Sequence, residues 1–338
     1  MGGAAAGGRR FGKGDWLRDG FGVWYKRRVR AVFFGTPEIA VPSLDALVGI
    51  ADVVGVICQP DRPAGRGLEL KAPPVKRRAL ELGLPVVQPV KVRTPDFAAW
   101  VKEREADVAV VIAYGRILPK GVLEAPRLGC MNLHASILPR YRGAAPITWA
   151  VVRGEEETGV SLMQMDEGMD TGPVFAIRCI PIGADETADE LAVRVAALAA
   201  EVVREDLPRA VRGELAATAQ DHAAATMAPL LEKKDGRVPW EKAAREVHDH
   251  VRGMTSWPGA FTSADGKMLK VLATKVAAAE GAGAAPGTVV AADRAGVRVA
   301  CGAGEVAILR AQLEGRKALG AAELVAGRAL RPGMVLGS

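Results

Sequence analysis

VAVVIA, residues 108–113, is an uninterrupted apolar run typical of a strand buried on both faces of a parallel sheet. Similar runs recur on either side of it, separated by helix-like stretches. Strands that alternate with helices in this way predict an α/β fold with a mostly parallel sheet. The other expected strands are Val29–Phe34, Val53–Cys58, Val86–Gln88, Cys130–His134, Val160–Met165 and Val174–Cys179. The expected helices are Val75–Leu82, Asp96–Glu105, one from Ile147, and Thr187–Val211. A further helix is expected to begin at Pro37, with Thr36 as its N-cap.

The sequence pattern changes after Gly213. An irregular stretch is followed by an expected helix at Glu241–Val251, and turn signals then separate short strand-like runs. Such runs predict a small β-barrel. A chain of 338 residues is also longer than one core usually holds. We therefore expect a Rossmann-like domain over 29–213, a linker over 214–239 and a β domain over 240–338. The strands expected in the β domain are Leu269–Thr274, Thr288–Ala292, Val297–Cys301 and Val306–Leu313.

Residues 1–28 differ in composition from the rest of the chain. They are rich in glycine and basic residues and contain no serine, which favours a disordered extension over a transit peptide, although import into an organelle stays open. The whole chain has 45 Lys plus Arg against 39 Asp plus Glu, a formal charge of +6. That charge is compatible with a polyanionic partner without requiring one.

The four cysteines are expected to be buried apolar side chains. Cys58, Cys130, Cys179 and Cys301 form no C-x-x-C pair and have no histidine at ligand spacing. This argues against disulfides and against a metal site, and it favours the reducing cytoplasm. No apolar run is long enough to span a bilayer.

Asn132 and His134 are the first candidate functional residues. They are two apart at the end of an expected strand, so both side chains leave the same face at its carboxyl end, where ligands bind in such folds. Taken alone, the pair equally suits a hydrogen-bonded core histidine. Further along, MDEGMDTGP at 165–173 contains Asp170 between two glycines, while Asp166 is interpreted as an Asx-turn residue.

A family resemblance is carried by five blocks of sequence in order: FFGTPEIAVPSL, QPDRPAGRG, AYGRILP, NLHASILPRYRGAAPI and GVSLMQMDEGMDTGP. The chain from about Val29 onward resembles the bacterial methionyl-tRNA formyltransferases, and WPGAF at 257–261 adds to the match. The resemblance implies transfer of a formyl group from 10-formyltetrahydrofolate to methionyl initiator tRNA, without a metal. It also implies that the second domain is an OB-like barrel that binds tRNA.

The resemblance assigns catalytic and folate-binding roles to particular residues. Asn132 and a protonated His134 would donate hydrogen bonds to the formyl oxygen as its negative charge develops, and Asp170 would hold the imidazole and accept a proton. The folate-binding turn would be Ser136, Ile137, Leu138 and Pro139, where this chain has Ala135 and Ile137 instead of the commoner Gly and Leu.

The resemblance also implies a tRNA-binding surface. Residues 59–78 are expected to form a long loop without regular structure, and Arg62, Arg66 and Lys71 would enter the acceptor stem, with Arg66 as the key arginine. Before the second domain the family tends to have a Tyr and a Lys that contact the 3′ end of the tRNA, whereas this chain has Met227 and Leu230. Lys233 and Lys234 are therefore the candidates for the contact with the 3′ end.

Other functions remain as alternatives. Glycinamide ribonucleotide and amino-sugar formyltransferases share the Asn–His–Asp set but do not need the basic loop or this second domain. A formyltetrahydrofolate hydrolase usually carries a different amino-terminal domain. A catalytically silent RNA-binding relative would not need Asn132, His134 and Asp170. The nicotinamide-binding motif G-x-G-x-x-G is absent from the first turn, GTPEIA. We expect a monomer.

Overall fold

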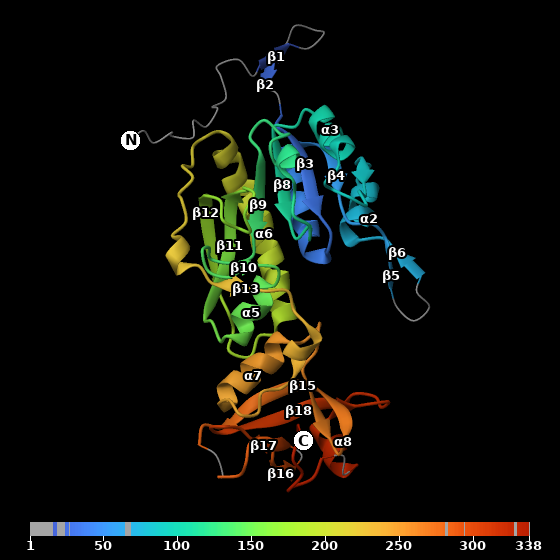
Figure 1. The fold of residues 1–338 in the computed structure, drawn as a ribbon, viewed down its shortest axis with the longest axis vertical. Coiled ribbons are helices and arrows are strands. Elements are labelled where there is room, and N and C mark those ends of the chain that lie inside the picture. Colours follow the sequence, from blue (N-terminus) through green and yellow to red (C-terminus); the bar gives the residue numbers. More distant parts are fainter. Residues whose placement is uncertain are drawn as a thin grey trace. The chain divides into compact units, whose positions relative to one another are not determined.

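The computed structural model describes residues 28–64, 69–280, 283–293, 295–327 and 330–337, and two short paired strands, β1 (Trp16–Arg18) and β2 (Trp24–Lys26) (Figure 1). The expected extension 1–28 lies almost entirely outside these residues. The chain divides into two compact units, the first of Met1–Arg142, Gly159–Cys179 and Val193–Met227, the second of Gly143–Thr158, Ile180–Ala192 and Ala228–Ser338.

The first unit is built on a seven-stranded, mostly parallel sheet with the strand order β12-β11-β9-β8-β3-β4-β7. The parallel pairs involve β3, β4, β7, β8 and β9, while β11 runs antiparallel to β9. This confirms the predicted fold class. The strands are β3 (Arg30–Gly35), β4 (Asp52–Ile57), β7 (Val86–Val87), β8 (Val108–Ile112), β9 (Cys130–His134), β11 (Glu157–Gln164) and β12 (Val174–Pro181), close to the predicted positions.

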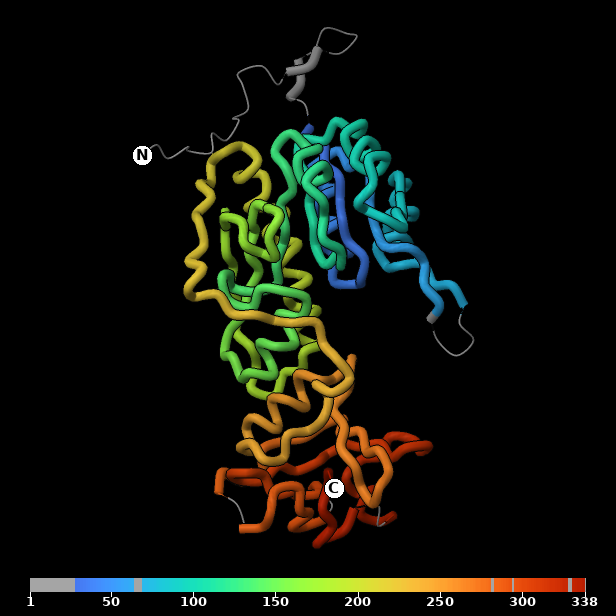
Figure 2. The backbone as a smooth tube through the Cα atoms, in the orientation of Figure 1, coloured from blue at the N-terminus to red at the C-terminus, as the bar shows by residue number. Residues whose placement is uncertain are grey.

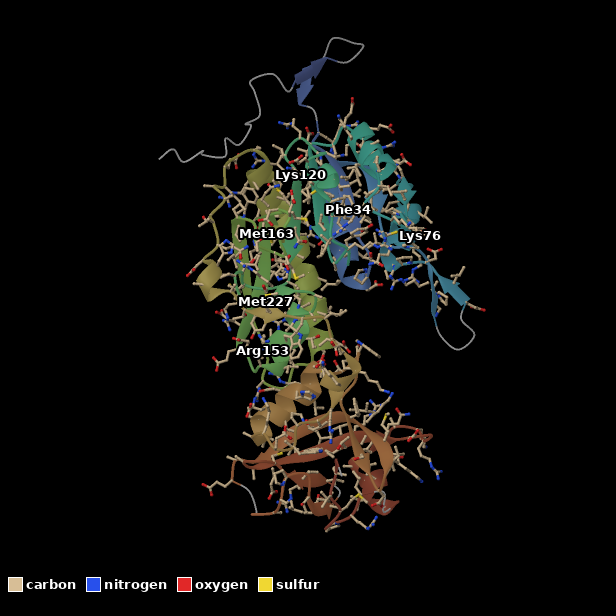
Figure 3. The ribbon with its side chains drawn as sticks, viewed as in Figure 1. Phe34, Lys76, Lys120, Arg153, Met163 and Met227 are labelled. Carbon is tan, nitrogen blue, oxygen red and sulfur yellow. The ribbon has the colours of Figure 1, made fainter. Side chains whose placement is uncertain are left out.

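Buried apolar side chains on one face of this sheet pack against α3 (Pro95–Glu103) and α4 (Lys120–Leu123). Phe34 of β3 lies at the centre, with its ring 5.3 Å from Tyr114 and 6.4 Å from Phe97, both edge to face (Figure 3). Such aromatic pairs add to the free energy gained by burial. The other helices of this unit are α1 (Val41–Ile50), α2 (Pro74–Glu81) and most of α6 (Ala188–Val211), whereas α5 (Pro146–Val152) belongs to the second unit.

Thr36 does not cap a helix as predicted. A short 3-10 turn, Glu38–Ala40, follows Pro37, and α1 begins only at Val41. The Thr36 hydroxyl instead donates to the carbonyl of Tyr114 at 3.2 Å and accepts from the backbone N–H of Gln59 at 3.3 Å. The hydroxyl is thus used between two neighbouring strand ends, and no side-chain bond caps the turn that follows. Thr36 therefore connects the carboxyl ends of β3, β4 and β8.

The region 59–78 has more regular structure than predicted. The strands β5 (Arg62–Ala64) and β6 (Glu69–Lys71) pair as an antiparallel hairpin, and α2 begins at Pro74 (Figure 2). The prolines and glycines suggested a loop, but an isolated edge strand tolerates a proline whose missing N–H faces solvent. The pairing of β5 with β6 joins residues several positions apart in the chain, and the local composition on which the prediction rests gives no sign of it.

The second unit contains a six-stranded antiparallel sheet, as the predicted β domain requires, with the order β14-β15-β18-β17-β16 and β19 paired to β18. Trp240, Leu269 and Ile308 lie in its core, and the indole N–H of Trp240 donates to Thr262 at 3.0 Å. The strands are β14 (Phe261–Ala264), β15 (Lys267–Ala278), β16 (Val289–Asp293), β17 (Gly296–Ala300), β18 (Glu305–Leu313) and β19 (Leu319–Gly320), with helices α7 (Ala244–Gly253) and α8 (Ala321–Ala326).

Cys179 is exposed, so the expectation of four buried cysteines is wrong at one position. It lies on β12, the edge strand of the parallel sheet, where alternate side chains face solvent. Cys58, Cys130 and Cys301 are buried, and burial raises the pKa of their thiols to about 11, 12 and 11. None of the described helices has the length and apolar composition needed to cross a bilayer.

Candidate active site

Strand β9 places Asn132 and His134 on one face, near the carboxyl end of the sheet. Their side chains are largely buried, with 9% and 5% of their surface exposed. Asn132 lies on β9 between two neighbouring strands, where its backbone pairs with Met163 of β11 on one side and with Val111 of β8 on the other. Within the described part of the chain, the Asn132 carboxamide makes no hydrogen bond. A nearly buried amide of this kind is available to a ligand.

His134 lies between two hydrogen-bond acceptors. Its Nε2 is 2.8 Å from the carbonyl oxygen of Tyr141, and its Nδ1 is 3.5 Å from a carboxylate oxygen of Asp170. An acceptor therefore lies near each ring nitrogen, and each nitrogen can carry an N–H that points toward one of them. The Nδ1 contact is longer than a good hydrogen bond, which leaves that N–H able to reach another acceptor. The structure therefore brings together the three predicted catalytic residues within one unit.

Asp170 belongs to a tight loop that joins β11 to β12. Its φ of +55° lies in the left-handed region, which aspartate tolerates better than most residues. Asp166 closes the start of this loop, because its carboxylate accepts from the N–H of Gly168 at 2.9 Å and from Thr171 at 2.7 Å. At Gly172 a Cβ would overlap the carbonyl oxygen of Gln164. These features fix the loop in one conformation.

The predicted folate-binding turn is partly committed to internal bonds. The Ser161 hydroxyl donates to the carbonyl of Ser136 at 2.7 Å and accepts from the N–H of Leu138 at 3.1 Å. The Ser136 hydroxyl donates to the carbonyl of Arg140 at 2.6 Å, and the Leu138–Pro139 bond is cis. Ser136 and Leu138 are buried, whereas Ile137 and Pro139 remain half-exposed. The latter two are the members of the turn that a ligand can contact through their side chains.

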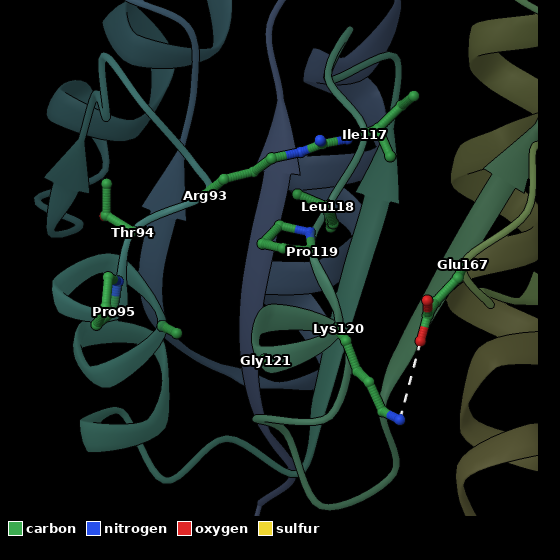
Figure 4. Close-up of a pocket in the computed structure, with 10 residues that line it drawn as sticks. Arg93, Thr94, Pro95, Ile117, Leu118, Pro119, Lys120, Gly121 and Glu167 are labelled. Atoms are coloured by element: carbon green, nitrogen blue, oxygen red, sulfur yellow. Dashed lines mark ion pairs between the residues drawn. The ribbon is translucent and has the colours of Figure 1, made fainter.

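A pocket of about 510 Å³ lies within the first unit (Figure 4). Its walls come from the segment after β8 and from the amino-terminal end of α3, and Glu167 adds a side chain from the loop that holds Asp170. Lys120 points toward Glu167, with 3.9 Å between their charged atoms (Figure 4). The pocket therefore combines apolar walls with charges at its rim, as small-molecule sites commonly do. It is lined by Arg93, Thr94, Pro95, Ala98, Ile117, Leu118, Pro119, Lys120, Gly121 and Glu167.

Of the predicted tRNA-binding residues, Arg62 and Lys71 lie directly opposite each other on β5 and β6. Like charges in such a position destabilise an isolated hairpin, so an anionic ligand would relieve the repulsion. Arg66 lies outside the described residues. Lys233 and Lys234 are exposed in the second unit, in a 3-10 turn at Lys233–Gly236, and Lys234 bonds Glu232 at 2.8 Å, which raises the pKa of its ammonium.

The base of the hairpin is held by a polar cluster. Asp61 accepts from Lys76 at 2.7 and 2.9 Å and from the Gln88 amide at 2.7 Å, and these bonds lower the pKa of its carboxyl group. Gln59 donates to the carbonyl of Tyr114 at 2.9 Å. The cluster thus connects the hairpin to the carboxyl ends of β4 and β8 (Figure 3, where Lys76 is labelled).

Sequence reasoning missed the groups that surround His134 and Asp170. The partner of His134 Nε2 is the backbone carbonyl of Tyr141. Because every residue has such a carbonyl, the identity of the Tyr141 side chain does not indicate this contact in the sequence. Gln220, which bonds the backbone of the Asp170 loop, lies in the stretch expected to be a linker. No group of three potential metal ligands occurs among the residues described.

Comparison with known proteins identifies the family. Residues 29–207 match the formyl transferase family, and residues 230–329 match the formyl transferase C-terminal domain. The chain is 74% identical to a methionyl-tRNA formyltransferase of Sorangium cellulosum over 91% of its length and 100% of that protein. It is 51% identical to that of Myxococcus xanthus, over 90% of this chain and 97% of that one.

Two solved structures share the fold. An N-formyltransferase from Helicobacter canadensis, in complex with folinic acid and dTDP-3-aminofucose, superimposes with a TM-score of 0.64 at 18% identity, over 83% of this chain and 98% of that one. A methionyl-tRNA formyltransferase from Clostridium thermocellum gives a TM-score of 0.51 at 16% identity, over 74% and 94%. Because the fold and the near full-length identity to named relatives agree, the chain belongs to the methionyl-tRNA formyltransferase family.

Proposed function

We propose that this enzyme transfers the formyl group of 10-formyltetrahydrofolate to the α-amino group of methionyl initiator tRNA. Relatives named methionyl-tRNA formyltransferase are 74% and 51% identical to this chain. The observation that carries the proposal is the unpartnered carboxamide of Asn132 on the same strand face as His134. Both are hydrogen-bond donors suited to an oxygen on which negative charge develops.

The reaction joins the methionine nitrogen to the formyl carbon and breaks the bond from that carbon to N10 of the folate. As the amine attacks, the carbonyl electrons move to the formyl oxygen, where Asn132 and the Nδ1–H of His134 donate to it. Asp170, 3.5 Å from Nδ1, stabilises the charged ring and accepts the proton that the amine loses, directly or through water. N10 takes up a proton as it leaves, so the products are formylmethionyl-tRNA and tetrahydrofolate.

The folate is proposed to bind between the turn Ser136–Pro139 and the pocket beside the Asp170 loop. Ile137 and Pro139 are the half-exposed members of the turn, and Leu118 and Glu167 belong to the pocket walls. A folate-type ligand, folinic acid, is present in the related Helicobacter structure, which supports a folate co-substrate for this fold. A pterin has apolar faces and polar edges, which match a pocket of mixed lining.

The tRNA is proposed to bind the β5–β6 hairpin and the second domain. Arg62 and Lys71 are adjacent on the hairpin stem, Arg66 belongs to its tip in sequence, and Lys233 and Lys234 would contact the 3′ end. Arginine and lysine provide a salt-sensitive attraction to phosphates. In this proposal residues 29–213 form the catalytic domain, which includes the hairpin, 214–239 form the linker that carries Lys233 and Lys234, and 240–338 form the tRNA-binding domain.

The enzyme is proposed to act as a cytoplasmic monomer. The bacterial origin of its named relatives supports the location, since protein synthesis in bacteria takes place there. Light scattering at micromolar concentration would test the monomer, and a mass of twice 35.5 kDa would contradict it.

The experiment is a formyl-transfer assay with initiator Met-tRNA, elongator Met-tRNA and glycinamide ribonucleotide as alternative acceptors. We expect transfer to the initiator alone. Replacing Asn132 or His134 by Ala should lower kcat at least a hundredfold, because loss of one oxyanion donor costs about 2.7–4 kcal/mol of barrier. Glu103→Ala, at the exposed carboxyl end of α3, is the control and should keep full activity. Transfer confined to the ribonucleotide, or near-normal turnover by both variants, would refute the proposal.

A further inference from the structure

Residues 218–226, here called the strap, contact both backbone segments that flank His134. At one end, Thr218 and Val174 exchange two backbone hydrogen bonds of 2.8 Å at the start of β12. At the other end, Thr226 accepts at its hydroxyl from the N–H of Tyr141 at 2.9 Å and at its carbonyl from the N–H of Arg142 at 2.9 Å. The strap therefore holds the residue whose carbonyl bonds His134, and it reaches the strand that follows the Asp170 loop. All these residues belong to the first unit.

Gln220 lies in the middle of the strap and bonds the Asp170 loop directly. Its side-chain nitrogen donates to the carbonyl of Asp170 at 2.9 Å and to the carbonyl of Gly172 at 2.7 Å. One amide thus uses both of its N–H groups on the backbone on either side of Thr171. Asp170, whose carbonyl is one of the two acceptors, has the left-handed φ of +55°.

Arg142 fixes the orientation of the Gln220 carboxamide. Its Nε and Nη2 donate to the Gln220 oxygen at 3.1 and 2.7 Å. The Arg142 side chain is buried, with 6% of the residue exposed, and a guanidinium has donors only, so the Gln220 oxygen must face it and the nitrogen must face the loop. Hydrogen bonds to a charged donor of this kind are stronger than those between neutral groups.

We propose that Gln220 is a positioning residue that sets the distance between the Asp170 carboxylate and Nδ1 of His134. This inference rests on the proposed catalytic role of Asp170. Without the two amide bonds, the carbonyls of Asp170 and Gly172 lose their donors and the loop can rotate the carboxylate away from the ring. Gln220 touches no reacting atom, so its loss lowers the rate through Asp170 and not through substrate binding.

The Gln220→Glu variant provides the sharpest perturbation. Glutamate has the same shape and keeps its bonds to Arg142, but it replaces both N–H donors by a charged oxygen that repels the loop carbonyls. Gln220→Ala removes all the bonds. Gln312→Glu is the matched control, because the Gln312 amide donates to one backbone carbonyl, that of Arg316 at 2.7 Å, on the surface of the second unit.

The test is a double-mutant cycle with Asp170→Asn, measured in the full-length enzyme by steady-state formyl transfer. We expect Gln220→Glu and Gln220→Ala to lower kcat by roughly ten- to a hundredfold, with both KM values changed less than about twofold. In the Asp170→Asn background the same changes should cause almost no further loss, because residues that act as one unit are not additive. Gln312→Glu, which lies in the domain proposed to bind tRNA, should leave kcat and the KM for folate unchanged.

A second readout separates positioning from general damage to the fold. The chain has four histidines, so ring 15N signals can be assigned, and Gln220→Glu should shift those of His134 while those of His248 and His250 stay in place. Wild-type kcat in both Gln220 variants, or a full additional loss in the Asp170→Asn background, would overturn the inference. If Asp170→Asn itself retains normal activity, the proposed catalytic role of Asp170 fails instead, which keeps the two failures distinct.

Discussion

At the scale of single residues, the site depends on two backbone conformations that are uncommon for their residue types. Tyr141 and Asp170, the two partners of His134, have φ values of +61° and +55°. Non-glycine residues in this region store strain on the order of 1–3 kcal/mol each and persist only where other contacts impose them. The N–H of Tyr141 is bonded to Thr226, and the carbonyl of Asp170 to Gln220. The strain is therefore held by residues far along the chain.

Asn132 offers a direct probe of substrate binding because it is the only asparagine in the sequence. Protein labelled with 15N-asparagine should give one side-chain amide signal pair. Saturation with 10-formyltetrahydrofolate should shift this pair, since the amide has no partner within the described structure before the ligand supplies one. Asn132→Ala, which should abolish the signals, provides the assignment. An unmoved pair in protein that binds folate by calorimetry would contradict the proposed oxyanion contact.

At the scale of elements, the sequence was sufficient for structure that depends on local composition. The apolar run VAVVIA and its neighbours predicted β3, β4, β8 and β9, because strands buried on both faces need such runs. Asn132 and His134 could be placed on one face because strands have a period of two. The hairpin β5–β6, the strap and the exposed Cys179 were missed, since each depends on which distant segment lies beside it.

The hairpin should lose tRNA affinity when its base is loosened. Asp61→Asn removes the ion pair with Lys76 and weakens the cluster that connects β5 to β4 and β8. We expect the KM for Met-tRNA to rise at least about threefold, with the KM for folate unchanged, because the three hydrogen bonds to Asp61 orient the basic stem. Asp45→Asn, which breaks the exposed pair with Arg78, is the control. An equal rise for folate and tRNA would contradict a separate role for the hairpin.

At the scale of the whole molecule, charge distinguishes the two proposed substrates. The formal charge of +6 is small, and Arg62 and Lys71 lie opposite each other on the hairpin proposed to bind the polyanion. We expect the KM for Met-tRNA to rise about tenfold between 50 and 200 mM salt, as counterion release predicts for two or three phosphate contacts. The KM for the folate, a small dianion, should change less than about twofold. Equal salt dependence for the two substrates would contradict the proposed phosphate contacts.

The single exposed cysteine has a practical consequence for spectroscopy. At pH 8 the buried thiols of Cys58, Cys130 and Cys301 stay protonated and shielded, because burial raises their pKa to about 11, 12 and 11. A maleimide dye added to the native protein therefore has Cys179 as its accessible target, on the edge strand β12 that follows the Asp170 loop. The natural sequence thus provides a fluorescence reporter on the strand that follows the Asp170 loop, without the removal of any other cysteine.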